Sequence, residues 1–82
     1  SAGVAIVVAV AFQIVALTLD ADDNVIERRV VPRPYPTREE AVTAIECIVS
    51  TFGVAGYEPE GDFWWATTGN GETRVRFIIE GV

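Results

Sequence analysis

The chain has 82 residues and a net charge of −6, and half of its residues are hydrophobic. A chain of this length forms a single domain, and its apolar content argues against disorder. Its acidic charge disfavours nucleic-acid backbones and anionic membrane surfaces as partners. The sequence contains no histidine, the commonest general base and metal ligand. Its single cysteine excludes an internal disulfide and a thiolate zinc site, so we expect a cytoplasmic protein without a cofactor.

Residues 3–19 form an apolar run, GVAIVVAVAFQIVALTL, that only two polar residues interrupt. A membrane span needs about 20 consecutive apolar residues, and an export leader begins with a basic segment that this run lacks. Its valines and isoleucines favour a β-strand. We therefore predict residues 1–11 as an apolar strand extension that pairs with a second protomer, and residues 12–82 as one domain. The alternatives for residues 1–11 are an export-leader remnant, indicated by the small residues of Ala9-Val10-Ala11, or residues added for expression.

Two strands joined by a polar turn are predicted next. The runs FQIVALTL (12–19) and VIERRVV (25–31) are rich in β-branched residues, and DADDN (20–24) between them is a turn cluster. The prolines of residues 32–36 end the second strand, because proline lacks a backbone donor. The acidic turn resembles the start of a calcium loop but lacks the glycine and the distant glutamate of one. We therefore predict a solvated hairpin turn.

The clearest predicted element is a helix over residues 38–52. Thr37 and Glu40 form a capping box at its start, since each side chain can satisfy a backbone amide there, and Gly53 ends it. Apolar residues repeat at the spacing of a one-faced helix, at Ala41, Ala44, Ile45, Ile48, Val49 and Phe52. Cys47 lies away from the centre of this face and has no histidine to activate it, so we interpret it as a boundary residue.

After the helix we expect a loop over residues 53–62 and then a second hairpin. DFWWATT and ETRVRFIIE are its predicted strands, and Asn70-Gly71 favours the positive φ angles of a tight turn. The carboxylates Glu58, Glu60 and Asp62 are interpreted as solvated charges rather than as a catalytic pair. The predicted fold is therefore α+β, in the order β-β-α-β-β, with a four-stranded antiparallel sheet and one helix packed on one face.

The pairing of the last two strands decides which tryptophan faces the core. If residues 69–71 form a three-residue loop, Phe63 lies opposite Phe77, whereas a two-residue turn places Trp65 opposite Arg76. We favour the three-residue loop, because it groups the apolar residues of the last strand with aromatic ones. The core face then holds Phe63, Trp65, Val75, Phe77 and Ile79, and the other face holds Trp64, Ala66, Arg74 and Arg76.

Aromatic and arginine side chains of the second hairpin, with two tyrosines from the segments that flank the helix, are the candidate site. They are Trp64, Trp65, Arg74, Arg76, Tyr35 and Tyr57. Tryptophan and arginine are enriched at protein interfaces, which favours a dimer contact. The alternative is a surface on which a planar anionic or aromatic ligand stacks.

Two family resemblances accompany this pattern. FQIVALTLDADDNVIERRVV followed by YPTREEAVTAIECI is similar to the repeat of the YegP-like domains of unknown function. The match covers about residues 12–48, and GNGETRVRF matches a second hairpin. This resemblance implies a small, dimeric bacterial α+β protein and supplies no catalytic residue. A looser likeness to HicB-type antitoxin domains, which pair a hairpin with a T-x-E-E-A helix, implies a protein partner such as a toxin.

We therefore predict a non-catalytic homodimeric interaction or assembly module. A first strand that is apolar on both faces needs cover on both, and the predicted helix covers only one, so a second protomer is the simplest partner. A small-ligand-binding domain that uses the tryptophans and arginines is the alternative, and an antitoxin-like protein-binding domain is another. An enzyme is the least favoured class, because the sequence offers no nucleophile–base pair and no metal-ligand set.

Overall fold

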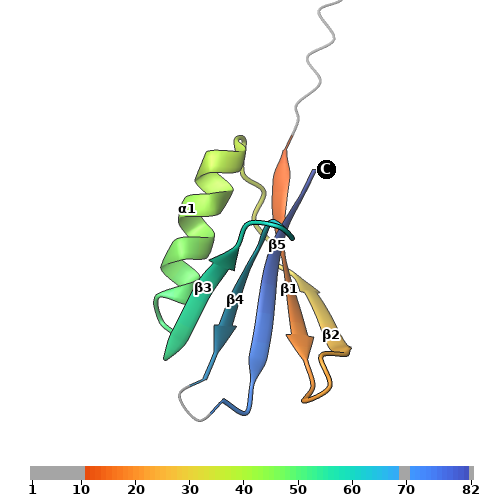
Figure 1. The fold of residues 1–82 in the computed structure, drawn as a ribbon. Helices are drawn as coiled ribbons and strands as arrows, with labels where there is room; N and C mark the ends of the chain where they lie inside the picture. Colours follow the sequence, from red (N-terminus) through yellow and green to blue (C-terminus); the bar gives the residue numbers. More distant parts are fainter. Residues whose placement is uncertain (1–10, 69–70, 82) are drawn as a thin grey trace, which may run out of the picture.

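The computed structural model describes residues 11–68 and 71–81, which form a five-stranded antiparallel sheet with one helix packed on one face (Figure 1). In chain order the elements are β1 (Phe12–Leu19), β2 (Val25–Val30), α1 (Arg38–Val49), β3 (Val54–Glu58), β4 (Phe63–Thr67) and β5 (Arg74–Gly81). The strands lie in the order β2-β1-β5-β4-β3. The α+β class is confirmed, whereas the prediction of four strands is wrong by one.

The additional strand, β3, lies within residues 53–62, for which the sequence predicts a loop. β3 pairs with β4 along its whole length, with Gly56 opposite Trp65. A Cβ atom at Gly56 would lie 2.7 Å from the Trp65 ring, so the indole lies directly over this glycine. Glycine weakens the strand pattern of the sequence. The strand forms because β4 supplies both its hydrogen-bonding partner and an aromatic cover.

Helix α1 begins where the sequence predicts and ends three residues earlier, at Val49. Its N-cap is Thr37, whose hydroxyl accepts a hydrogen bond from the Glu40 amide at 3.2 Å, which confirms this half of the predicted capping box. The Glu40 carboxylate accepts from the Thr37 hydroxyl at 3.3 Å, in place of the Thr37 backbone amide that the motif predicts. Beyond Val49, the hydroxyls of Ser50 and Thr51 donate to carbonyl oxygens of the last helical turn at 2.6 and 2.7 Å. These bonds satisfy helical carbonyls that have no partner within the helix, and they end it before Gly53.

The first hairpin matches the predicted strands and turn. β1 spans the predicted residues, and β2 ends one residue earlier than predicted. In the turn, Oδ1 of Asp20 accepts hydrogen bonds from the amides of Asp22 and Asn24 at 2.8 and 2.9 Å, and Asp23 has a φ of 63°. The hydrogen bond from the Asn24 amide lowers the pKa of Asp20. The acidic residues therefore stabilise the geometry of the turn.

The register of the last hairpin is not the favoured one. β4 and β5 pair with Trp64 opposite Phe77 and Trp65 opposite Arg76, which is the alternative that the sequence leaves open. The closing pair is Thr68 with Thr73, joined by a bond of 3.0 Å from the Thr68 amide to the Thr73 carbonyl. This register is shifted by one residue from the register that a three-residue loop would give. A shift of one residue turns every side chain of one strand to the opposite face of the sheet.

Because of this shift, each side chain of β4 lies on the face of the sheet opposite to the predicted one. Trp64 and Ala66 are buried in the core, so placing them on the outer face is wrong. Trp65, together with Phe63, points away from the helix, so the prediction that these two face the core is wrong as well. The apolar residues of β5 do lie on the core side as predicted, and these are Val75, Phe77 and Ile79.

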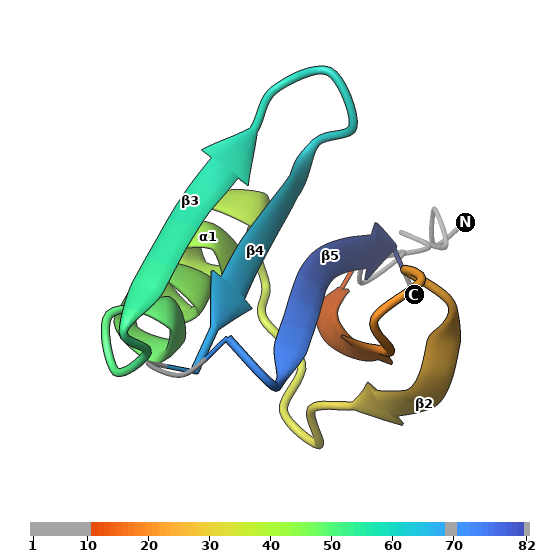
Figure 2. The ribbon, with the colours of Figure 1, turned by 60° about the horizontal axis from the view of Figure 1, so that its bottom comes forward.

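The core lies between α1 and the sheet, and its buried side chains are Ile14, Ala41, Ile45, Trp64, Ala66 and Phe77. The predicted apolar face of the helix is thus confirmed. α1 packs on β1, β4 and β5, whereas β2 lies at the far edge of the sheet (Figure 2). Val15 and Leu19 are buried on the other face of β1, although no helix covers them. The sheet curls strongly around β1 and β5, so neighbouring strands cover this face within one chain (Figure 2).

The predictions for residues 1–11 lie outside the described residues, except at Ala11. Next to them, β1 begins at Phe12, whose amide and carbonyl both bond with Tyr35 at 2.8 Å. Within residues 11–68 and 71–81, no helix is long and apolar enough to cross a membrane.

Candidate functional site

The candidate site lies on the sheet face opposite α1, which we call the helix-free face. According to the strand registers, the side chains that lie on this face include those of Leu17, Leu19, Val25, Val30, Val54, Phe63, Trp65, Arg74, Arg76 and Ile78. Val25 and Val54 are each 53% exposed and Val30 is 37% exposed. Since Val25 and Val30 belong to β2 and Val54 belongs to β3, the helix-free face carries exposed valines at both edges of the sheet. Charged residues of the same strands, Arg28 on β2 and Glu58 on β3, also lie on this face.

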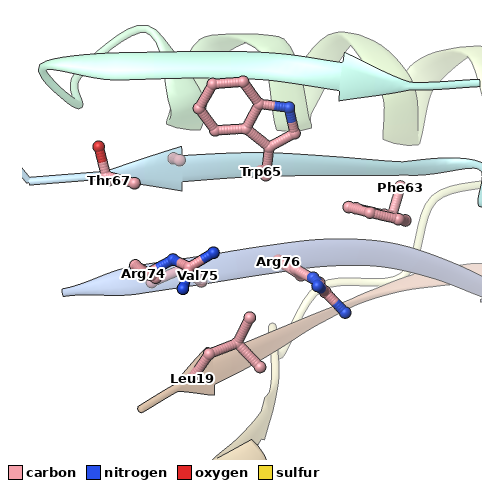
Figure 3. A pocket seen from close by; sticks show the side chains of 8 residues that line it. Leu19, Phe63, Trp65, Thr67, Arg74, Val75 and Arg76 are labelled. Carbon is pink, nitrogen blue, oxygen red and sulfur yellow. The ribbon is translucent and has the colours of Figure 1, made fainter. Parts of the chain in front are cut away.

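A pocket of about 350 Å³ lies within this face, between β1, β4 and β5 (Figure 3). It is lined by Leu19, Phe63, Trp65, Ala66, Thr67, Arg74, Val75 and Arg76, and we call it the Arg76 pocket. Trp65 stands on its β3 side, Leu19 on its β1 side and Phe63 at one end (Figure 3). The pocket therefore holds two guanidinium groups between mostly apolar walls.

The two arginines of the pocket differ in their partners. Arg74 pairs with Asp23 of the first turn, at 2.5 Å between Nη1 and Oδ1. Arg76 makes no ion pair within the described ranges, and its guanidinium lies 4.8 Å from the centroid of the Phe63 ring. A cation–π contact orients the guanidinium without neutralising it. The guanidinium of Arg76 therefore lies beside an aromatic ring and without a counter-charge among the described residues.

The other sequence candidates lie on the helix side of the sheet. Trp64 is 7% exposed, and the Tyr57 ring stacks on it at 4.7 Å between centroids. Tyr35 packs at the edge of the core, with the Arg33 guanidinium 5.3 Å from its ring centroid. The structure therefore separates the six candidates and brings together Trp65, Arg74 and Arg76. It adds Phe63 to this group, which the alternative register would have identified.

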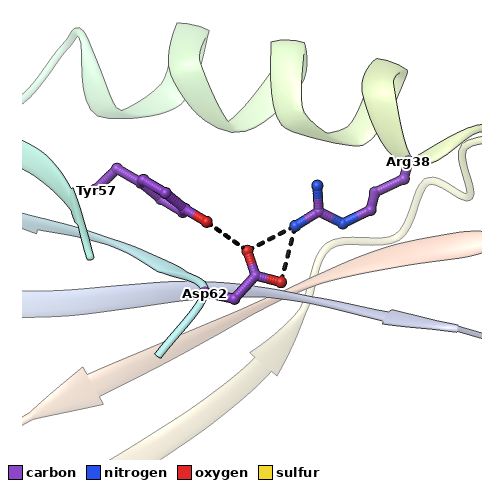
Figure 4. A network of polar contacts seen from close by, with 3 residues as sticks. All are labelled: Arg38, Tyr57 and Asp62. Atoms are coloured by element: carbon purple, nitrogen blue, oxygen red, sulfur yellow. Dashed lines mark hydrogen bonds and ion pairs between the residues drawn. The ribbon is translucent and has the colours of Figure 1, made fainter. Parts of the chain in front are cut away.

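A polar network that no local pattern predicts links the start of α1 to the turn between β3 and β4 (Figure 4). Nη2 of Arg38 donates to both carboxylate oxygens of Asp62 at 2.6 and 2.8 Å, and the Tyr57 hydroxyl donates to Oδ1 at 2.7 Å. The hydrogen bonds from Tyr57 and Arg38 lower the pKa of Asp62, and the bond to Asp62 raises the pKa of Tyr57. The three residues come from separate segments of the chain, so the sequence pattern does not predict that their side chains form hydrogen bonds with one another.

Replacing Asp62 with asparagine is expected to lower the free energy of unfolding near neutral pH, and this loss is expected to fade in acid. The folded-state pKa of Asp62 lies below its ordinary value of about 4. The ionised carboxylate therefore stabilises the fold above that value, and the stabilisation disappears as the pH falls through the folded-state pKa. Urea unfolding of both proteins from neutral pH down to about pH 2 measures the difference.

Unfolding measurements at alkaline pH and a matched control variant complete this test. The pKa of Tyr57 is raised, so its hydrogen bond stabilises the fold below the ordinary value of about 10 and is lost as the pH rises through the raised value. Asp22→Asn is the control, since it removes an exposed turn carboxylate for which the described residues supply no side-chain partner. A loss of stability in Asp62→Asn that does not change with pH would contradict the role of the network.

The remaining candidates stay apart from the helix-free face. Cys47 is exposed, in agreement with its predicted place outside the apolar face of the helix. Glu58 accepts a hydrogen bond from the Glu60 amide at 3.2 Å in the turn after β3. Over the residues that the structure describes, no group of three or more histidine, cysteine, aspartate or glutamate side chains is placed to hold a metal ion.

Comparisons with known protein families, with curated proteins and with solved structures find no match to this chain. The resemblance to YegP-like domains and the looser likeness to HicB-type antitoxin domains therefore stay predictions. Any proposal about function depends on the geometry of the helix-free face.

Proposed function

We propose that this chain is a non-catalytic interaction module that forms a homodimer through its helix-free face. The observation that carries the proposal is the exposure of apolar side chains at both edges of that face, Val25 and Val30 on β2 and Val54 on β3. Contiguous exposed apolar surface marks protein interfaces, whereas single exposed apolar residues do not. Trp65 lies half-buried between these edges, so a second copy that covers the face would bury apolar side chains at both edges and an aromatic ring between them.

The charges of the face support the same proposal. In a two-fold dimer the same surface of each copy meets the other, and arginine and tryptophan are enriched in the centre of such interfaces. Arg28 and Glu80, which pair at 2.9 Å, lie on this face as an already neutralised pair. Each copy carries a net charge of −6, so two copies repel one another at long range. The apolar contact therefore drives association, and added salt is expected to strengthen it by screening the repulsion.

Light scattering on the full chain over a range of concentrations tests the proposal. We expect a mass near twice the 8.9 kDa of one chain. The double variant Val25→Glu with Val54→Glu is expected to return the mass to 8.9 kDa, because it places charges on the face at exposed positions without altering the core. The control is Ile26→Glu in the bulge of β2, a position that is 64% exposed and has no partner in β1. A monomeric full chain, or a control that dissociates as readily, contradicts the proposal.

Residues 1–11 enter the proposal as an intersubunit strand. A version that starts at Phe12 separates their contribution from that of the helix-free face. If the full chain is a dimer and the shorter version a monomer, the opening residues contribute to the interface. If both versions are dimers of equal stability, the helix-free face is sufficient and the intersubunit strand is rejected.

A second candidate function is the binding of a small ligand in the Arg76 pocket. The observation that favours it is the Arg76 guanidinium, which has no ion pair with any described residue and lies in a pocket lined by Phe63 and Trp65. An antitoxin-like protein-binding domain is supported by sequence resemblance alone. An enzyme stays the least favoured proposal, because the sequence has no histidine to activate Cys47. We propose a cytoplasmic location, since nothing in the sequence needs an oxidising compartment.

A further inference from the structure

We infer that the Arg76 pocket binds a small planar carboxylate, such as a single aromatic ring that bears one carboxyl group. This inference rests on the second candidate function, ligand binding on the helix-free face, and specifies its chemistry. Three observations carry it: the lack of an ion pair at Arg76 within residues 11–68 and 71–81, the size and lining of the pocket, and the ion pair of Arg74 with Asp23.

The unpaired charge is unusual for this chain, which has six arginines and twelve acidic residues. Four of the arginines pair with a carboxylate in the described part of the chain. The two that do not are Arg33, which is exposed, and Arg76, which is half-buried among apolar side chains. A partly desolvated guanidinium without a counter-charge is unfavourable. An anion from outside the chain would therefore be held more strongly at Arg76 than at Arg33.

The lining of the pocket selects the shape of that anion. The Arg76 guanidinium lies 4.8 Å from the centroid of the Phe63 ring, and this contact restricts its motion and limits the entropy lost when a ligand binds. A guanidinium of fixed orientation donates two parallel hydrogen bonds to a carboxylate. Trp65 and Leu19 form apolar walls on either side, suited to the faces and edges of a ring (Figure 3). A volume of about 350 Å³ is at the small end of ligand pockets and fits a single-ring compound.

The local charges favour one negative charge over several. Arg74, the other cation of the pocket, is already paired with Asp23, so one guanidinium is left for the ligand. The chain as a whole carries a net charge of −6, which repels phosphate esters and polyanions more strongly than a monoanion. A monocarboxylate therefore matches the pocket better than a nucleotide or an inorganic phosphate does.

Titration of the full chain with benzoate, followed by tryptophan fluorescence, tests this inference. We expect a saturable change with benzoate and none at the same concentrations with benzamide, its uncharged analogue. Arg76→Met is expected to weaken binding about tenfold or more, because it keeps the apolar stem and removes the charged donor. Arg33→Met is the matched control, since it removes the other arginine without an ion pair, and it is expected to bind benzoate unchanged. Trp65→Phe is expected to abolish the fluorescence response, because Trp64 is buried on the other side of the sheet.

Three outcomes would overturn the inference: no saturable response to benzoate, equal binding of benzamide, or equal losses in Arg76→Met and Arg33→Met. Light scattering on the same samples measures the mass of the protein, so the proposed homodimer is tested independently of the proposed carboxylate site. A stable dimer that does not bind benzoate rejects the carboxylate site and supports the interface. A monomer that binds benzoate supports the carboxylate site and rejects the homodimer.

Discussion

Replacing Trp64 with alanine is expected to lower the free energy of unfolding by about 3–5 kcal/mol. Trp64 is 7% exposed, lies opposite Phe77 and stacks on the Tyr57 ring. Its removal would leave a cavity beneath α1 that a small domain cannot refill. Urea unfolding followed by circular dichroism measures the loss, because a fluorescence signal would change with the tryptophan content.

The matched variant for this prediction is Trp65→Ala, which removes the same side chain one residue further along β4. Trp65 lies on the helix-free face against Gly56, and it is half-buried rather than buried. We expect a clearly smaller loss of stability than in Trp64→Ala, because less apolar surface returns to water. A larger loss in Trp65→Ala than in Trp64→Ala would favour the register with Phe63 opposite Phe77 and would contradict the observed pairing.

Replacing Ile45 with alanine is expected to cost about 2–5 kcal/mol of stability. Ile45 is fully buried in the middle of α1 and belongs to the core cluster between the helix and the sheet. A chain of this size has a total stability of only about 4–12 kcal/mol. The variant is therefore expected to unfold at a much lower urea concentration, and part of the population is expected to be unfolded in buffer alone.

Ile26→Ala is the matched control for the core, since it makes the same chemical change at an exposed position. Ile26 is 64% exposed in the bulge of β2, far along the sheet from α1. We expect its free energy of unfolding to stay within about 0.5 kcal/mol of the wild-type value. Similar losses in Ile45→Ala and Ile26→Ala would mean that the helix does not pack as described.

Several elements could be predicted because neighbouring residues encode them. The β1 strand, the DADDN turn and the Thr37 cap each depend on residues close in the chain, and the structure contains all three. The apolar face of α1 likewise follows from the periodicity of its apolar residues, which predicts correctly that Ala41 and Ile45 face the core. The end of the helix was less predictable, because the hydroxyls of Ser50 and Thr51 compete with the backbone for its last carbonyls.

The candidate site was predictable in its residue types and not in its arrangement. The sequence pattern singled out Trp65, Arg74 and Arg76, and the structure places them on one face. It also singled out Trp64 and Tyr57, which the observed register turns to the helix side. The predicted and observed arrangements differ by a shift of one residue in the pairing of β4 with β5, and the residues of the hairpin are compatible with either register.

The sequence by itself determined the class of the fold, the helix with its cap, the first hairpin and the acidic, histidine-free character of the chain. Tertiary structure decided the existence of β3, the face on which each tryptophan lies and the lack of an ion pair between Arg76 and any described carboxylate. The physical reason is the range of the interactions involved. Caps, turns and apolar periodicity act over a few residues, whereas β3 needs the Trp65 indole over Gly56, and the pocket needs three strands to meet.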